Sequence, residues 1–311
     1  MLLALSFTLG GLAVLPAAAD RFVVAASRIS RILGLSPILV GALLVGFGTS
    51  LPEIVVSGLA AAKGETDFAV ANVVGSNVAN LALVLGFAAA IRPIGANRSL
   101  VRKEGSLVLL VTLLYVILHI NGDIQRWEAM VLLAVLALSL GLLIRWSENV
   151  LLDEENDLER YVTVRRELVL GVITMIFTVA AATLLVEGAE RLAVELDIQS
   201  AFIAATLVAV GTSLPELATA IAAVRRHQAD LVLGNVLGSN LFNALAVGGI
   251  AGLIGPGIID PGFRVLLLVL FGITVFAGLL VATGSRLVRW EGFALLAVFG
   301  LFVFLAGSNL A

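Results

Sequence analysis

Long apolar stretches separated by short polar connections run through the whole chain. A helix needs about 20 apolar residues to cross a bilayer, and most of these stretches reach that length. Apolar residues do not alternate with polar ones at period two, which excludes a transmembrane β-barrel. The pattern therefore predicts an all-α integral membrane protein with ten transmembrane helices, near residues 2–26, 35–62, 68–91, 105–120, 127–145, 168–194, 199–224, 230–253, 263–283 and 290–308.

Composition agrees with this class and narrows the chemistry. Of 311 residues, 60% are hydrophobic and 13% are charged, and the mean hydropathy is +1.10. Because these residues fill ten spans with short loops, no room remains for a sizeable soluble domain. The chain has no cysteine and two histidines, which argues against disulfides and against zinc or copper sites of the usual kind. A net charge of −3 gives no sign of nucleic-acid binding.

Basic residues are unevenly distributed among the connections between the predicted helices. Alternate connections contain 14 of the 19 basic residues, and the others contain only Lys63, Arg126, Arg191 and Arg264. The positive-inside rule places the basic set in the cytoplasm and both termini outside. The longest polar stretch, Ser147 to Glu167, is then a solvated cytoplasmic linker.

The strongest signal is an internal repeat. The segment Gly48 to Glu53, with sequence GTSLPE, returns as Gly211 to Glu216, at an offset of 163 residues. Across 33 positions at this offset no gap is needed, and 14 positions are identical. Because five helices separate the copies, equivalent helices should cross the bilayer in opposite directions, as in inverted-repeat transporters with a midplane substrate site. We therefore expect a first five-helix repeat at 1–146, a linker at 147–167 and a second repeat at 168–311.

The repeat contains two acidic residues in apolar surroundings. Glu53 and Glu216 lie far from the predicted helix ends, where a charge costs at least ~2.5–3.5 kcal/mol, and neither has a basic residue within one helical turn. They follow Pro52 and Pro215, whose rings prevent a continuous helix and free a backbone carbonyl. Two interpretations remain: a bound cation, or a neutral, hydrogen-bonded glutamic acid.

Polar side chains on the next predicted helices extend this pattern. Asn72, Ser76 and Asn80 share one helical face, because they are spaced by four residues. All these candidates offer oxygen ligands, which suit Ca²⁺, Na⁺ or Mg²⁺, but Mg²⁺ sheds water reluctantly. Two carboxylates would neutralise one Ca²⁺ or two Na⁺. We expect Asn77 and Asn240, which point away from this face, to form hydrogen bonds between helices.

Two blocks together, GTSLPE followed by NVxGSNxxN, resemble the α-repeats of the calcium/cation antiporter superfamily, in its prokaryotic sodium/calcium exchanger branch. The resemblance implies a multi-pass protein of a prokaryotic cell (inner) membrane. It implies an antiporter that couples Na⁺ influx to Ca²⁺ export by alternating access, with the first and sixth helices as the gate. Its cargo would be Ca²⁺ and Na⁺, without an organic cofactor, and its surroundings the lipid bilayer, without a nucleic-acid or protein partner.

The resemblance also implies which residues bind the transported ions. These are the side chains of Glu53, Glu216, Thr49, Ser50, Thr212, Ser213, Ser76, Asn80, Ser239 and Asn243, and the backbone carbonyls of Gly46 and Ala209. Some relatives, including potassium-dependent exchangers, have Asp where this chain has Asn243, which weakens the case for K⁺ dependence.

Three other functions are compatible with parts of the pattern. A Ca²⁺/H⁺ antiporter would use the same carboxylates, although that branch usually has different motifs. A passive cation channel is disfavoured by helices that break at a closed midplane site. An intramembrane enzyme with a Ser nucleophile would need a buried base, and the predicted spans contain no His or Lys at midplane depth. We therefore expect a transporter and not an enzyme.

Overall fold

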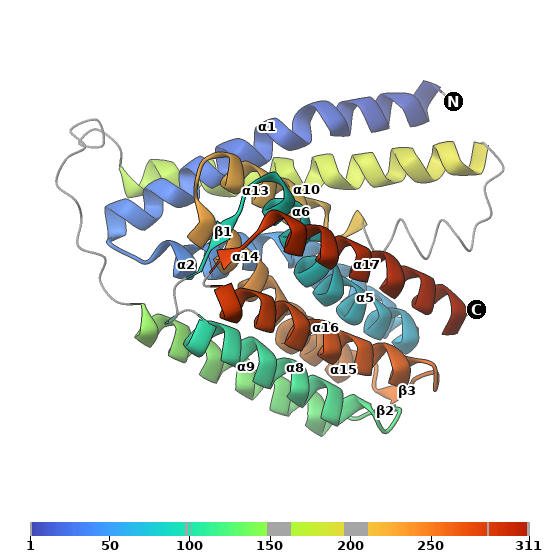
Figure 1. Cartoon of the computed structure of the whole chain (residues 1–311). Helices are drawn as coiled ribbons and strands as arrows, with labels where there is room; N and C mark the ends of the chain where they lie inside the picture. The colour runs from blue at the N-terminus through green and yellow to red at the C-terminus, as the bar shows by residue number, and fades with distance from the viewer. Residues whose placement is uncertain are drawn as a thin grey trace.

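The computed structural model describes residues 2–96, 99, 101–147, 163–195, 211–284 and 286–309, and almost all of them are helical (Figure 1). In the first half the elements are α1 Leu2–Leu33, α2 Pro37–Val40, η1 Gly41–Gly46, α3 Phe47–Thr49, α4 Leu51–Ala62, α5 Thr66–Val78, η2 Ala79–Val84, α6 Leu85–Ile91, β1 Ile94–Gly95, η3 Val101–Gly105, α8 Ser106–His119, β2 Asp123–Ile124 and α9 Arg126–Trp146, where η marks π-helical segments. In the second half they are α10 Val164–Glu195, α13 Leu214–Arg225, α14 Ala229–Phe242, η6 Asn243–Val247, α15 Gly248–Ile254, β3 Gly257–Ile258, α16 Phe263–Gly284, β4 Arg286–Leu287 and α17 Arg289–Asn309.

Most of the predicted apolar stretches correspond to a helix in the structure. Among the described residues, seven helices are long and apolar enough to cross a membrane, and an eighth span is the bent pair Pro37–Thr49 and Leu51–Ala62. The helix α8 has only 14 residues, and much of the predicted span 199–224 lies outside the described residues. The predicted end of the first helix at residue 26 is wrong, because α1 continues to Leu33.

The boundary predicted for the central linker is also wrong. The helix α10 begins at Val164, so the last residues of the predicted solvated stretch are helical. Glu167 is fully buried, and its carboxylate accepts a hydrogen bond of 3.0 Å from the guanidinium of Arg28 on α1. This buried ion pair therefore joins the end of the linker to the first helix.

Two continuous helical stretches form the buried centre of the molecule. They are Thr66–Ile91 and Ala229–Ile254, each 78% buried, whereas the other long spans are buried by 22–39%. The remaining helices surround this centre and expose apolar side chains such as Leu138 and Phe304. The two central stretches contain the polar blocks of the repeat.

The elements themselves recur at the offset found in the sequence. The helices α4 and α13 begin at Leu51 and Leu214, and α9 and α17 begin at Arg126 and Arg289, each pair 163 residues apart. The π-helical segments η2 and η6 follow the same spacing. The repeat therefore extends from the conserved-looking blocks to the whole order of elements in each half.

Two short ribbons join the halves. Strand β1 pairs antiparallel with β4, with Ile94 opposite Leu287, and β2 pairs antiparallel with β3, with Asp123 opposite Ile258. Each ribbon takes one strand from each half of the chain. Because α16 runs from β3 to β4, the ribbons lie at opposite ends of this helix (Figure 1).

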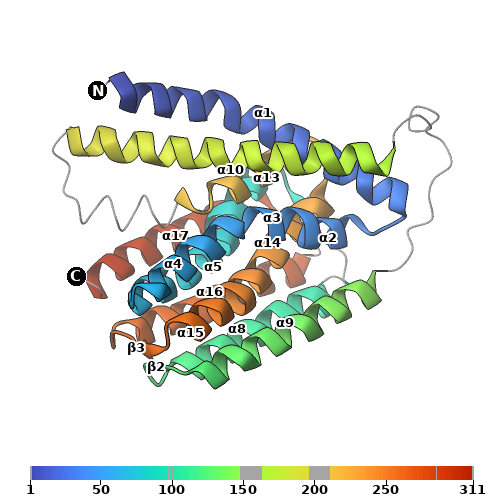
Figure 2. The ribbon, with the colours of Figure 1, turned by 180° about the vertical axis from the view of Figure 1, so that it is seen from behind.

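A pair of long helices lies along one side of this bundle. The helices α1 and α10 run next to each other in both views (Figures 1 and 2). Glycine allows their close approach, because a Cβ atom at Gly11 would lie 2.7 Å from the carbonyl oxygen of Ala181, and one at Gly188 would lie 2.9 Å from that of Ala4. The two helices therefore pack against each other without intervening side chains at these positions.

Candidate cation site

The helix that contains Glu53 is broken immediately before the acidic residue. The helix α3 ends at Thr49 and α4 begins at Leu51, with a bend of 42°. Proline in the first turn removes no helical hydrogen bond, so Pro52 starts α4 rather than interrupting a continuous helix. Glu53 is consequently in the first turn, where the helix dipole favours negative charge.

The second half repeats this geometry. Ser213 has φ −90° and ψ 6°, close to the φ −84° and ψ 0° of Ser50, and α13 begins at the next residue. Glu216 is in the first turn of α13. The sequence predicted a break from the two prolines, and the structure adds that each acidic side chain begins a new helix.

Both carboxyl groups are completely buried and lie close enough for the charge of one to act on the other. The Glu216 carboxyl faces the hydroxyl groups of Thr49 and Ser50 from the first half. None of the four carboxyl oxygens of Glu53 and Glu216 forms a hydrogen bond within 3.5 Å or an ion pair with a described residue. Two adjacent buried carboxylates without partners are costly, so the site needs a cation or protons.

Other buried oxygen atoms near the breaks also lack partners among the described residues. These are the hydroxyls of Ser50 and Ser213 and the amide oxygens of Asn80 and Asn243. Unsatisfied buried polar atoms are rare in proteins. Their presence in both halves, together with two free carboxyl groups, fits a site whose remaining partners are cations.

Sequence reasoning missed the π-helical segments. Asn80 lies in η2, and Asn243 begins η6. Such segments change the direction of side chains along a helix and are frequent at functional sites. The sequence analysis contains no signal for them, because its argument assumed the four-residue spacing of an ordinary α-helix.

Two asparagines hold the broken helices in place. The Asn72 amide donates to the Ser57 hydroxyl at 2.8 Å and to the backbone carbonyl of Glu53 at 3.4 Å. The Asn235 amide donates to the Thr219 hydroxyl at 3.2 Å, and, at 3.4 Å, to the carbonyl of the acidic residue in its own half. Each amide therefore fixes the first turn in which a carboxyl group lies.

The same asparagines connect the two halves. The Thr49 hydroxyl lies 3.5 Å from the amide oxygen of Asn235, and the Thr212 hydroxyl lies 3.5 Å from that of Asn72. Both contacts are at the outer limit of a hydrogen bond. The pattern predicted Asn72 and Asn235 on the site face, whereas their supporting partners Ser57 and Thr219 were missed, although each lies about one turn after an acidic residue.

Some predicted ligands already have protein partners. The Gly46 carbonyl accepts hydrogen bonds from the Ser239 hydroxyl at 3.2 Å and from the Thr49 hydroxyl at 3.3 Å. The Ser76 hydroxyl donates to the carbonyl of Asn72 at 2.6 Å, within its own helix. These groups lie at the site, but binding an ion would compete with these hydrogen bonds. Ala209, the other predicted carbonyl ligand, lies outside the described residues.

The prediction for Asn77 and Asn240 is wrong. The Asn77 amide donates to the carbonyl of Val73 at 2.8 Å, and the Asn240 amide donates to the carbonyl of Val236 at 2.7 Å. Both bonds are within one helix, not between helices. Packing is tight on both central helices, so these amides satisfy their donors four residues back.

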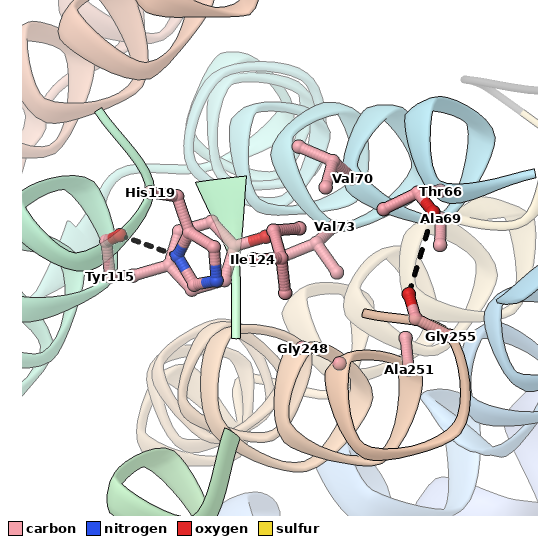
Figure 3. A pocket seen from close by; sticks show the side chains of 11 residues that line it. Thr66, Ala69, Val70, Val73, Tyr115, His119, Ile124, Gly248, Ala251 and Gly255 are labelled. Atoms are coloured by element: carbon pink, nitrogen blue, oxygen red, sulfur yellow. Dashed lines mark hydrogen bonds between the residues drawn. The ribbon is translucent and has the colours of Figure 1, made fainter. Parts of the chain in front are cut away.

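A separate small cavity lies between α5, α8 and α15 (Figure 3). Its volume is about 10 Å³, enough for one water molecule, and its lining is mostly apolar. The His119 ring bonds the carbonyl of Tyr115 at 2.8 Å beside this cavity. Because no carboxyl group lines it, this cavity is not the cation site.

Comparisons with known proteins agree with the geometry. Residues 3–145 and 167–307 match the family described as sodium/calcium exchanger protein. The chain is 38% identical to the putative antiporter CaxA of Alkalimonas amylolytica, over 84% of this chain and 83% of that protein. It is 28% identical to the sodium/calcium exchanger MaX1 of Methanosarcina acetivorans, over 94% and 95%.

A solved structure shows the same fold. The sodium-calcium exchanger NCX_Mj, soaked with 10 mM Na⁺ and no Ca²⁺, superposes with a TM-score of 0.87 at 32% identity, covering 97% of this chain and 98% of that one. The match includes both halves and the central stretches that contain the acidic residues. The protein is therefore a multi-pass membrane transporter, not an enzyme, and it belongs to the sodium/calcium exchanger family.

Proposed function

We propose that this protein is a secondary active antiporter that exchanges Na⁺ for Ca²⁺ by alternating access, exporting Ca²⁺ as Na⁺ enters. One observation carries the proposal: Glu53 and Glu216, one from each half, meet in the interior without a basic partner among the described residues. One Ca²⁺ or two Na⁺ would neutralise the same pair of charges. Competition for a common charge is a physical basis for exchange, because either cargo stabilises the buried site.

The ligands in this proposal are oxygens from both halves. Glu53 and Glu216 bind the ions, and the hydroxyl groups of Thr49, Ser50, Thr212, Ser213, Ser76 and Ser239, the amide oxygens of Asn80 and Asn243, and the carbonyls of Gly46 and Ala209 complete the coordination. The unpartnered hydroxyl and amide atoms near the helix breaks support this set. Hard oxygen ligands of this kind suit Ca²⁺ and Na⁺.

The proposed architecture is ten spans in two inverted five-helix repeats, joined by a cytoplasmic linker. The recurrence of elements at 163 residues and the two ribbons at opposite ends of α16 support this arrangement. The distribution of basic residues places the end that contains Arg92, Arg225 and Arg289 in the cytoplasm and both termini outside. The pair α1 and α10 slides against the bundle to open the site on alternate sides.

Purified protein in lipid vesicles tests the proposal. Ca²⁺ uptake is measured with an imposed Na⁺ gradient, with an imposed pH gradient, and with a K⁺ gradient as the control. Uptake driven by Na⁺ supports Na⁺/Ca²⁺ exchange. Uptake driven only by the pH gradient identifies the alternative, a Ca²⁺/H⁺ antiporter that uses the same carboxylates. A lack of uptake with every gradient refutes both.

Two variants test the site itself. We expect Glu53→Gln and Glu216→Gln each to abolish Ca²⁺ uptake while the protein stays folded, because each removes half of the charge that neutralises the cation. Glu65→Gln is the matched control, since Glu65 is exposed and precedes α5. Wild-type uptake by either site variant would contradict the assignment.

A further inference from the structure

An open hollow of about 420 Å³ lies at one end of the bundle, away from the proposed ion site. Three elements form its wall: the end of α6 with Ile91, Arg92 and Pro93, the end of α13 with Val224 and Arg225, and the start of α17 with Arg289. Three of these six lining residues are arginines. The hollow therefore concentrates three positive charges between segments that are far apart in the sequence.

These arginines are not neutralised by the described part of the protein. Among described residues, none of the three forms an ion pair with a carboxylate. Arg92 lies 2.7 Å from the ring nitrogen of His227, and Arg289 donates to the backbone carbonyl of Ile91 at 3.3 Å. Arg225 forms no hydrogen bond or ion pair with a described residue and is exposed. The guanidinium groups thus remain available to an anion.

The internal repeat supplies a control for the significance of this feature. One offset away, the positions of Arg92 and Arg225 are occupied by Gly255 and Ala62, and only Arg126 retains the charge of Arg289. Gly255 packs directly against the backbone of Ala61, so the equivalent space is filled. The backbone framework alone therefore does not produce a basic hollow. It arises from side chains present at only one end.

The surroundings of the hollow are those of a membrane surface. Trp290, next to Arg289, is 66% exposed, and Phe293 and Phe87 are also exposed on α17 and α6. Exposed aromatic side chains at helix ends are typical of the level of lipid headgroups. The close packing of Gly86 against Gly292 holds these two helices together below the hollow. A phosphate at this depth would meet the arginines while its acyl chains contact apolar side chains.

We infer that this hollow is a binding site for a phosphate-bearing anion, recognised by Arg92, Arg225 and Arg289. Guanidinium groups bind phosphate through paired hydrogen bonds and retain their charge at all physiological pH values. Basic pockets between membrane helices are suited to anionic lipid headgroups. The inference does not depend on the transported ion. A headgroup and a free phosphate share this chemistry, and the experiment distinguishes them.

The test uses the full-length protein in a neutral detergent. Three ligands are titrated separately: dioctanoyl phosphatidylglycerol, dioctanoyl phosphatidylcholine as the zwitterionic control, and inorganic phosphate. Binding is followed by the shift of the unfolding temperature and by native mass spectrometry, which counts bound molecules. We expect one saturable site for phosphatidylglycerol, with at least tenfold weaker binding of phosphatidylcholine. Saturable binding of inorganic phosphate in place of the lipid would identify a soluble anion as the ligand.

Variants distinguish a built site from general attraction to basic surfaces. We expect R92Q/R225Q/R289Q to weaken binding at least tenfold, and Arg225→Gln alone to weaken it severalfold. The single variant also guards against misfolding, since Arg225 has no hydrogen bond to lose. The matched control, R145Q/R165Q/R166Q, removes three exposed arginines elsewhere and should bind within twofold of wild type. Equal loss in both triple variants, or no saturable binding of either phosphate ligand, would overturn the inference.

Discussion

The closest approach between the halves near the ion site suggests a precise perturbation. Gly238 on α14 packs against η1, and a Cβ atom added there would overlap the Cα atom of Ala42 and lie 2.7 Å from its carbonyl oxygen. Backbone atoms cannot rotate away, so in Gly238→Ala the two helices must separate. Bringing the 2.7 Å contact to about 3.0–3.4 Å requires a displacement of about 0.3–0.7 Å.

This displacement is large for the chemistry nearby. The next residue, Ser239, donates its hydroxyl to the Gly46 carbonyl at 3.2 Å, so a shift of α14 stretches this contact between the halves. The whole range of Ca²⁺–oxygen distances is only about 2.3–2.6 Å. We therefore expect Gly238→Ala to weaken Ca²⁺ binding at least about tenfold, and overpacking to destabilise the protein by about 1–3 kcal/mol.

Unfolding temperature and Ca²⁺ affinity measured on the same purified protein provide the assay. The expected destabilisation corresponds to an unfolding temperature lower by about 2–8 °C. Gly141→Ala in α9 is the control, because a Cβ atom there meets no atom within 4 Å. It should leave affinity unchanged and stability equal or slightly higher, since Ala favours helix over Gly. Wild-type stability and affinity in Gly238→Ala would refute the packing argument.

Three further predictions concern charged groups. Ca²⁺ uptake should fall as the pH is lowered from about 8 to about 5, because protons compete for the paired site carboxylates, and a Ca²⁺ affinity independent of pH in this range would contradict it. Arg28→Gln should destabilise the protein by about 1–3 kcal/mol, since it leaves the buried Glu167 carboxylate unpaired, whereas R28Q/E167Q should recover most of the unfolding temperature. Asp20→Asn removes the ion pair with Arg226, whose two contacts measure 2.6 Å. Because both side chains are more than 40% exposed, the unfolding temperature should change by less than about 2 °C.

Much of the fold could be predicted because the hydrophobic pattern is strong. Continuous apolar stretches specify membrane helices directly, and the predicted ranges 127–145 and 290–308 lie within one residue of α9 and α17 at each end. Helix ends were harder to predict where polar residues remain helical. The helix α1 extends past residue 26 to Leu33, and α10 begins at Val164 because Glu167 finds a buried partner on another helix. A contact between distant segments leaves no trace in local hydropathy.

The candidate site divides in the same way. The repeat and the two prolines identified Glu53 and Glu216 without coordinates, because isolated acidic residues in apolar segments demand an explanation. The pattern did not reveal the π-helical turns at Asn80 and Asn243, since their spacing departs from the α-helix. Nor did it show that Ser239 of one half occupies the Gly46 carbonyl of the other.

The sequence by itself determined the membrane class, the positions of most helices, the repeat and the pair of acidic residues, because hydropathy and self-similarity are local or directly comparable properties of the chain. Only the tertiary structure decided that the acidic side chains begin separate half-helices and face each other across the two halves. It also brought Arg92, Arg225 and Arg289 around one hollow. These features depend on which segments pack together, and the packing of distant segments is a property of the whole fold.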